Sequence, residues 1–277
     1  MNFITRVSNT FTRRNSENIF FLHIPKCGGV SIGHAIASLY LTLNLRNDSG
    51  IVNLNAPISR RVIEDTEGFH YPSDTNDDFP ILDFREKLLI YFMAQPNTRL
   101  ITGHFLFSKV AFQKYGERFS FITVLRDPVK RWISSYFYNQ FTAKDQLKVN
   151  DDIEAHIESH FGISQGYQLV KFIGGANKEG DYTSEKAINR AKENLKLFKI
   201  VGFLDNLGLF SKEFYDRYRV NLRIKKENQN PAPKEYQKTT ITPEILKRIT
   251  EICQPDMQVY EYATDYFRTV EHKQHLT

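Results

Sequence analysis

Short apolar runs rich in β-branched and aromatic residues alternate along the chain with longer segments in which apolar positions recur at helical spacing. The runs predict four buried strands, at residues 18–24, 99–104, 118–128 and 199–205. The periodic segments predict helices at residues 31–43, 81–95, 106–116, 129–143, 151–162 and 183–198. Strands that alternate with helices in this way usually pair in parallel. The pattern therefore predicts an α/β fold with a central, mostly parallel sheet flanked by helices.

Two segments depart from this alternation. Residues 46–80 are rich in Asn, Asp, Ser and Pro and have little periodicity, so they are expected to form a substrate loop or lid. Residues 1–18 are basic and polar and predict a flexible N-terminus. The rest of the 277-residue chain, 19–277, is expected to be one domain, because its length suits one large α/β domain or at most two small ones. Its 41% hydrophobic and 25% charged residues are ordinary for a globular enzyme.

Charge and cysteine content narrow the class of protein. A net charge of +5 favours anionic ligands, but the basic residues form no module that would indicate nucleic-acid binding. Cys27 and Cys253 are too few for a disulfide framework, which fits a reduced compartment. The first 18 residues hold no apolar run of the length that a signal peptide or membrane helix needs. We therefore expect a cytoplasmic protein, and the sequence does not indicate an oligomeric state.

The first predicted strand ends in the turn HIPKCGGVS, which has the residues of a phosphate-binding loop. Gly28 and Gly29 let the backbone approach an anion, and the amides of residues 27–31 can point into one concavity at the start of a helix. Lys26 adds a mobile positive charge and Ser31 adds a hydroxyl donor. The turn therefore predicts an anion site.

The turns after the next two strands predict a base and a second anion site. His104 follows the strand 99–104, where its imidazole could accept a proton from a hydroxyl at neutral pH; a structural histidine is the alternative. Arg126 ends the following strand, and Ser134 lies two helical turns into the next helix, so both could bind one phosphate. The alternative is that Arg126 and Asp127 form a pair that caps the helix.

Several common motifs are absent from the sequence. The chain has neither the GxxxxGK[ST] spacing of triphosphate loops nor the GxGxxG dinucleotide fingerprint. It contains no HExxH or CxxC, and neither cysteine has a partner at metal-ligand spacing, so we expect a metal-independent enzyme. His23, inside the first strand, is expected to be a core histidine that orients the phosphate turn.

Two of these turns resemble those of a known family. Residues 21–31, FLHIPKCGGVS, resemble the 5′-phosphosulfate loop of sulfotransferases that use 3′-phosphoadenosine 5′-phosphosulfate (PAPS), and residues 124–138, VLRDPVKRWISSYFY, resemble their 3′-phosphate segment. Residues 237–268 are similar to the closing segment of the branch that includes the heparan sulfate and dermatan uronosyl 2-O-sulfotransferases. The resemblance implies a P-loop-like three-layer fold and in-line transfer of a sulfuryl group from PAPS to a carbohydrate hydroxyl.

The resemblance also implies roles for individual residues. Lys26 would neutralise the charge that builds on the bridging oxygen as the sulfuryl group departs, and His104 would be the general base. Arg126 and Ser134 would bind the 3′-phosphate. The remaining donor-binding positions lie in the phosphate loop and in a late loop before the last helix; they are Cys27, Gly28, Gly29, Val30, Ser31, Lys238, Thr239 and Thr240.

The chain departs from the family pattern at three positions. Cys27 and Val30 stand where threonines are usual, which removes two side-chain donors but leaves the backbone cradle. Thr102 stands where the uronosyl enzymes carry a second histidine, which puts a uronic acid acceptor in doubt.

The acceptor is the least defined part of this interpretation. Arg60 and Arg61 in the 46–80 segment favour an anionic acceptor such as an acidic sugar, and a solvated loop is the alternative reading. Two other functions stay open: a sulfotransferase that acts on a protein tyrosine, a lipid or a small metabolite, and a non-catalytic protein that binds a nucleotide or a sulfated ligand. Golgi members of the family that the chain resembles carry a membrane helix, so the expected setting is a bacterial cytoplasm, and a Golgi enzyme separated from its anchor is the alternative.

Overall fold

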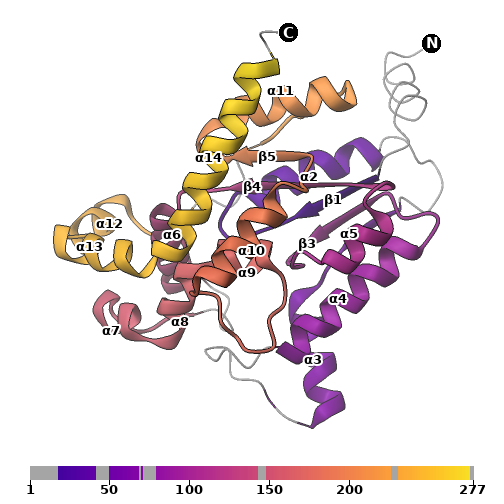
Figure 1. Cartoon of the computed structure of the whole chain (residues 1–277). Helices are drawn as coiled ribbons and strands as arrows, with labels where there is room; N and C mark the ends of the chain where they lie inside the picture. The colour runs from indigo at the N-terminus through magenta and orange to yellow at the C-terminus, as the bar shows by residue number, and fades with distance from the viewer. Residues whose placement is uncertain are drawn as a thin grey trace.

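The computed structural model describes residues 18–41, 50–68, 70, 79–142, 148–225 and 230–274. Within them, five strands form one sheet in the order β2-β3-β1-β4-β5, and every neighbouring pair is parallel (Figure 1). The strands are β1 Asn18–Leu22, β2 Ile51–Asn53, β3 Leu100–Gly103, β4 Phe119–Leu125 and β5 Ile200–Phe203. The predicted α/β fold with a parallel sheet is confirmed.

Helices cover both faces of this sheet (Figure 1). The helices are α2 Gly29–Leu41, α3 Ala56–Glu67, α4 Phe79–Ala94, α5 Lys109–Tyr115, α6 Pro128–Phe141, α7 Ile153–Glu158, α8 His160–Ser164, α9 Gln168–Gly174, α10 Glu185–Leu195, α11 Leu207–Tyr218, α12 Lys234–Thr240, α13 Pro243–Ile252 and α14 Gln254–Gln274. Two short 3-10 turns, η2 Gln165–Tyr167 and η3 Leu204–Asn206, complete the described elements. No helix in these ranges combines the length and hydropathy that crossing a membrane requires.

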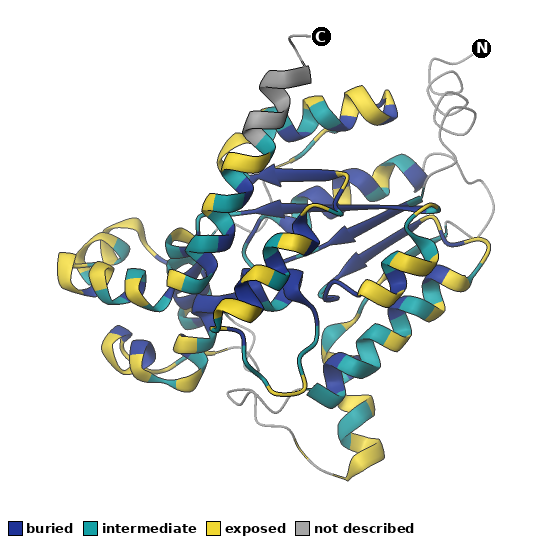
Figure 2. Cartoon of the chain, viewed as in Figure 1, coloured by how far each residue is buried: buried dark blue, intermediate teal, exposed yellow. Residues whose placement is uncertain are grey.

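The alternation of side chains along β1 explains the layers. Ile19 and Phe21 join the buried residues of α2 and α11 on one face of the sheet, whereas Phe20 and Leu22 join those of α4, α9, α10 and α14 on the other. Burial of one such side chain contributes about 1.5–3 kcal/mol, so this short strand is firmly held between two layers of helices. Figure 2 shows the resulting buried centre, with exposed positions on the outer sides of the helices.

The start of α6 sets the direction of a helix that contributes to the site. Asp127 follows β4, and its Oδ1 accepts a hydrogen bond from the Lys130 amide at 2.8 Å. Pro128 occupies the first turn, where its fixed backbone angle suits a helix and its missing amide hydrogen costs nothing. The helix therefore begins directly at the carboxyl end of the strand.

Residues 46–80 differ most from expectation. In the described part they form β2 and α3 instead of an irregular loop, and the Asn55 side chain caps α3 by accepting from the Ile58 amide at 3.1 Å. The expectation of a wholly irregular loop is therefore wrong. Residues 1–17, 46–49, 69 and 71–78 lie outside the described residues, so the flexible N-terminus and the substrate role of 46–80 stay predictions.

One other boundary also differs. The single helix expected at residues 151–162 is two short helices, α7 and α8. Ser159 separates them: it ends α7, and its Oγ accepts from the Gly162 amide at 3.0 Å to begin α8. A side chain that offers the backbone this alternative hydrogen bond favours helix starts over helix interiors.

Candidate active site

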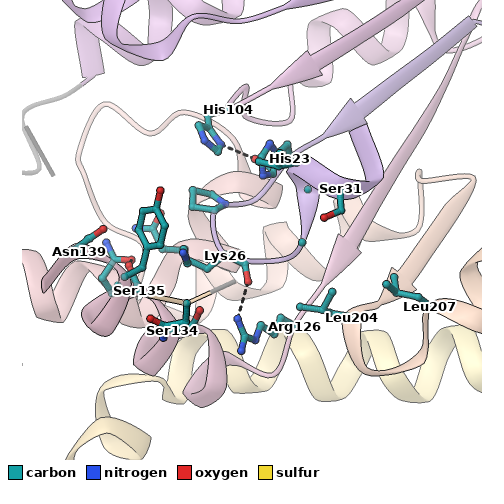
Figure 3. A pocket seen from close by; sticks show the side chains of 18 of the residues that line it. His23, Lys26, Ser31, His104, Arg126, Ser134, Ser135, Asn139, Leu204 and Leu207 are labelled. Carbon is teal, nitrogen blue, oxygen red and sulfur yellow. Dashed lines mark hydrogen bonds between the residues drawn. The ribbon is translucent and has the colours of Figure 1, made fainter. Parts of the chain in front are cut away.

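A cavity of about 870 Å³ lies beyond the carboxyl ends of β1, β3, β4 and β5. The residue or turn that follows each of these strands contributes to its lining: His23, His104, Arg126 and Leu204. Ligands of open parallel sheets bind at this edge, because the loops that follow the strands gather there. The three chemically equipped turns predicted from the sequence therefore converge on one cavity (Figure 3).

Most of the predicted site residues line this cavity. They are Lys26, Gly28, Gly29, Val30, Ser31, His104, Arg126 and Ser134. Cys27, Lys238, Thr239 and Thr240 are not among its lining residues.

The turn between β1 and α2 has an unusual backbone. Lys26 and Gly28 both have positive φ angles, of 66° and 76°. Gly29 begins α2 and lies against the His23 ring, because a Cβ atom at position 29 would fall 1.8 Å from a carbon of that ring. Amides in the first turn of a helix have no carbonyl partner within the helix. The turn thus presents such donors at the cavity, as an anion site requires.

Lys26 lies among other cations and against an aromatic ring. Its Nζ is 3.4 Å from the centre of the Tyr138 ring, a cation–π contact. Burial lowers the pKa of Lys26 to about 8, and the positive charges of Arg126 and Arg131 contribute to the decrease. An anion that binds in the cavity would stabilise the ammonium form of Lys26 and raise its pKa.

Arg126 fixes the phosphate turn as well as facing the cavity. Its Nη1 donates a hydrogen bond to the Lys26 carbonyl at 3.1 Å (Figure 3). Asp127 caps α6 through its own side chain, so the predicted alternative of an Arg126–Asp127 capping pair does not describe this arrangement. Ser134 also lines the cavity, so Arg126 and Ser134 face one shared space.

His104 is positioned by the strand beside it. Its Nδ1 lies 2.9 Å from the His23 carbonyl, which can only accept, so Nδ1 carries the proton and Nε2 keeps its lone pair. Burial lowers the pKa of His104; the bond to the His23 carbonyl opposes this effect, and the charge of Arg85 adds to it. The ring is therefore neutral near pH 7, as a general base must be.

His23 differs in part from expectation. It does stand next to the phosphate turn, but it lines the cavity instead of lying wholly in the core. Its ring centre is 4.5 Å from that of His104. Burial, together with the nearby His104, lowers the pKa of His23 to about 3, so this ring also stays neutral.

The chemistry of this cavity fits a donor with several phosphate charges. Three cations line it, Lys26, Arg126 and Lys225, and the described lining includes no Asp or Glu. The model of the Sulfotransferase family matches residues 9–263 of the chain. The chain belongs to the sulfotransferase family. Members of this family transfer sulfuryl groups from PAPS, and no curated protein sequence matches the chain closely enough to narrow the assignment.

Cys27 of this sulfotransferase does not take the position predicted for it. Its side chain is buried in the core cluster, its amide donates to the Ile24 carbonyl at 3.3 Å, and burial raises the pKa of its thiol to about 12. Neither group faces the cavity. The loss of a threonine side chain at this position therefore removes no donor from the cavity as the structure has it.

Lys238, Thr239 and Thr240 also differ from expectation. They lie in helix α12 instead of a loop, and both threonine hydroxyls donate to carbonyls of that helix, Thr239 to Glu235 at 3.2 Å and Thr240 to Tyr236 at 2.7 Å. Local hydrogen bonds of this kind satisfy the hydroxyls without a ligand. The structure does not bring these residues to the cavity.

The sulfotransferase cavity also contains residues that the sequence interpretation missed. They include Tyr138, Asn139, Phe161, Gln165, Gln168, Lys225 and Asn230. Tyr138 could have been found, because it follows Ser134 by one helical turn in α6. Gln165 and Gln168 come from a part of the chain whose place in space no sequence pattern indicates.

Proposed function

We propose that this sulfotransferase transfers the sulfuryl group of PAPS to a hydroxyl of a carbohydrate acceptor, with His104 as the general base. The observation that carries the proposal is the meeting of Lys26 and His104 in one cavity, at the ends of the paired strands β1 and β3. Lys26 can stabilise the charge on the leaving phosphate, and His104 can take the proton of the attacking hydroxyl. In-line displacement at sulfur needs both groups, one at each end of the reacting bonds.

The donor would be held by the loop and by α6. The first-turn amides and the Ser31 hydroxyl would bind the 5′-phosphate, and Arg126 with Ser134 would bind the 3′-phosphate. These groups and Lys26 all line one cavity, which supports this assignment. When bound, the donor supplies an activated sulfuryl group.

The reaction would need two functions from the protein. Lys26, with Arg126 close by, would place positive charge where the bridging oxygen becomes an anion. His104 would take the acceptor proton at Nε2, while the Nδ1 bond to the His23 carbonyl keeps the ring in the correct tautomer. Both side chains line the cavity, which supports catalysis over binding alone.

The compartment and the metal requirement belong to the proposal too. Cys27 and Cys253 are free and buried, which supports a cytoplasmic enzyme. Within the described ranges, no group of three His, Cys, Asp or Glu side chains is arranged to hold a metal ion. We propose a metal-independent transfer.

A binding and transfer experiment tests the proposed function. Calorimetric titration with phosphoadenosine phosphate should show one tight site, and radiolabelled PAPS should label members of a glycan panel equally well with and without a chelator. Tight binding without transfer to any glycan, peptide, lipid or metabolite would support the non-catalytic alternative. Labelling of tyrosine peptides or lipids in place of glycans would show that the acceptor is a protein or a lipid. Loss of transfer in the chelator would contradict a metal-independent reaction.

The pH dependence of the reaction follows from the two shifted groups. The pKa of Lys26 is about 8 in the free enzyme, so kcat/KM for the donor should fall as the pH rises through about 8 and the ammonium is lost. The pKa of His104 is below its ordinary value, so the base should stay neutral, and the rate unaffected, down to a pH below about 6.5.

Steady-state rates between about pH 5 and about pH 10 measure this profile. Lys26→Arg is the matched variant, because its guanidinium stays protonated across the whole range, and whatever activity it retains should lack the alkaline decrease. An alkaline limb that persists unchanged in Lys26→Arg would assign that limb to another group.

A further inference from the structure

One wall of the cavity carries primary amides beside the proposed base. Gln165 of η2 and Gln168 of α9 line the cavity, and Asn139 of α6 lines it as well. Gln168 and Phe172 are one turn apart on α9. The Phe172 and His104 rings pack edge to face, with their centres 6.2 Å apart. These three amides, Asn139, Gln165 and Gln168, are called the amide cluster below. The shared face of α9 places Gln168 on the His104 side of the cavity.

Each member of the amide cluster keeps a polar group without a protein partner in the described part of the chain. The Gln165 Oε1 accepts from Arg131 and from Ser135, each at 3.2 Å, which leaves its Nε2 unpaired. The Gln168 Nε2 donates to the Ser164 carbonyl at 2.8 Å, which leaves the Gln168 Oε1 without a hydrogen-bond partner among the described residues.

For Asn139, no hydrogen bond of the side-chain amide joins it to the described residues. Asn139, Gln165 and Gln168 are only 6%, 7% and 8% exposed. Polar groups buried this deeply nearly always have hydrogen-bond partners, so the cluster offers both donors and acceptors to a ligand in the cavity.

Two of the three cations that line the cavity, Lys26 and Arg126, come from the turns assigned to the donor, although the Lys26 Nζ reaches the Tyr138 ring of α6 at 3.4 Å. Lys26 and Arg126 are joined through the Lys26 carbonyl. Lys225 follows Ile224, which packs against the residues of α2 and α11 on the other side of the sheet from α9. Arg85 acts on His104 through its charge, but it is not a lining residue and donates to Ser59 and to the Ala56 carbonyl. Arg131 contacts the amide cluster through Gln165, but it is fully buried, interacts with the charge of the buried Asp256 and does not line the cavity. Within the described lining, the amide cluster therefore offers an acidic ligand no cation apart from Lys26, which is assigned to the donor.

Arg60 and Arg61, which favoured an anionic acceptor, do not supply a positive charge to the amide cluster. Arg60 pairs with Glu64 at 3.7 Å, and Arg61 pairs with Asp65 at 3.5 Å, each one turn along α3. Neither arginine lines the cavity. Their positive charges are thus compensated on their own helix.

We infer that the acceptor is an uncharged sugar, whose hydroxyls bind the amide cluster and whose apolar face lies against the Phe161 ring. Amides match hydroxyls because both groups donate and accept hydrogen bonds. Phe161 lines the cavity and precedes Gln165 by one turn in the chain. A carboxylate in this position would be buried without a counter-ion, which is costly. The inference rests on the proposed function and narrows it, against the anionic acceptor expected from the sequence.

A matched pair of acceptors tests this inference. Glucans, galactans and chitin oligosaccharides oxidised at C6 to the uronic acid would be compared with the methyl esters of the same oxidised polymers, which have the same hydroxyls and lack the charge. With radiolabelled PAPS, kcat/KM should be more than about tenfold higher for the uncharged ester. Equal values, or a preference for the charged form, would overturn the inference and leave the proposed function standing. Transfer to neither form, with phosphoadenosine phosphate still bound, would contradict the carbohydrate activity itself and the inference with it.

Gln168→Glu provides the second readout, because it exchanges an amide for a carboxylate of the same size. It should lower kcat/KM for an uncharged acceptor by about tenfold or more and leave the affinity for phosphoadenosine phosphate within about twofold. Gln113→Glu on the exposed side of α5 is the matched control and should change neither quantity. Equal losses of donor affinity and acceptor turnover in Gln168→Glu would indicate a structural role for Gln168 and overturn its place in acceptor binding.

Discussion

Lys26→Met is expected to lower kcat by more than about a hundredfold, because it would remove the positive charge that we propose stabilises the departing phosphate oxygen. Methionine keeps the length and the apolar stem that lie against Tyr138. The effect should therefore appear in the transfer step more than in folding. Loss of one fixed positive charge in a buried site typically costs a factor of this size, since water cannot replace it there.

Single-turnover transfer of radiolabelled sulfate measures this effect directly. Lys130→Met, four residues after Arg126 on the exposed side of α6, is the control for loss of a positive charge and should keep a normal rate. Calorimetry with phosphoadenosine phosphate separates binding from chemistry. A near-normal kcat for Lys26→Met would remove Lys26 from the reaction.

His104→Gln should also lower kcat by more than about a hundredfold, for a different reason. Glutamine can still donate a hydrogen bond to the His23 carbonyl, but it cannot take a proton from the acceptor. Donor affinity should stay close to normal, because His104 lies at the end of β3 and the residues proposed to bind the donor follow β1 and β4.

The pH profile distinguishes a base from a positioning residue. The residual activity of His104→Gln should no longer decrease on the acid side, and it should rise when the acceptor is replaced by one with a more acidic hydroxyl. His34→Gln, at an exposed position of α2, is the control. A variant with normal turnover, or with an unchanged acid limb, would contradict the assignment of His104.

The sequence was informative wherever one short segment determined both structure and chemistry. The apolar runs identified β1, β3, β4 and β5, because buried parallel strands are apolar on both faces. The turns that follow β1, β3 and β4 then had to meet, since parallel strands end at one edge. Lys26, His104 and Arg126 could be placed together on this basis alone.

The sequence was less informative where position depends on distant packing. β2 has only three residues and lies in a segment rich in Asn, Asp and Ser, so it lacked a detectable pattern. Cys27 appeared to belong to the phosphate loop, and only the packing of that loop shows its thiol directed into the core. Gln165 and Gln168 enter the cavity because η2 and α9 pack beside α6 and α14, a contact that no local pattern determines.

The central place of β1 has a consequence for how the enzyme forms. The hydrogen bond that positions His104 joins residues 81 apart in the chain, and the bond from Thr123 to the Leu22 carbonyl joins residues 101 apart. Contacts over such long chain separations form slowly, because the chain must lose the entropy of a large loop before it gains any contact. During synthesis, β1 therefore leaves the ribosome long before either of its partner strands exists. The candidate site of this sulfotransferase, which draws on residues between His23 and Asn230, can only form after β3 and β4 have been made.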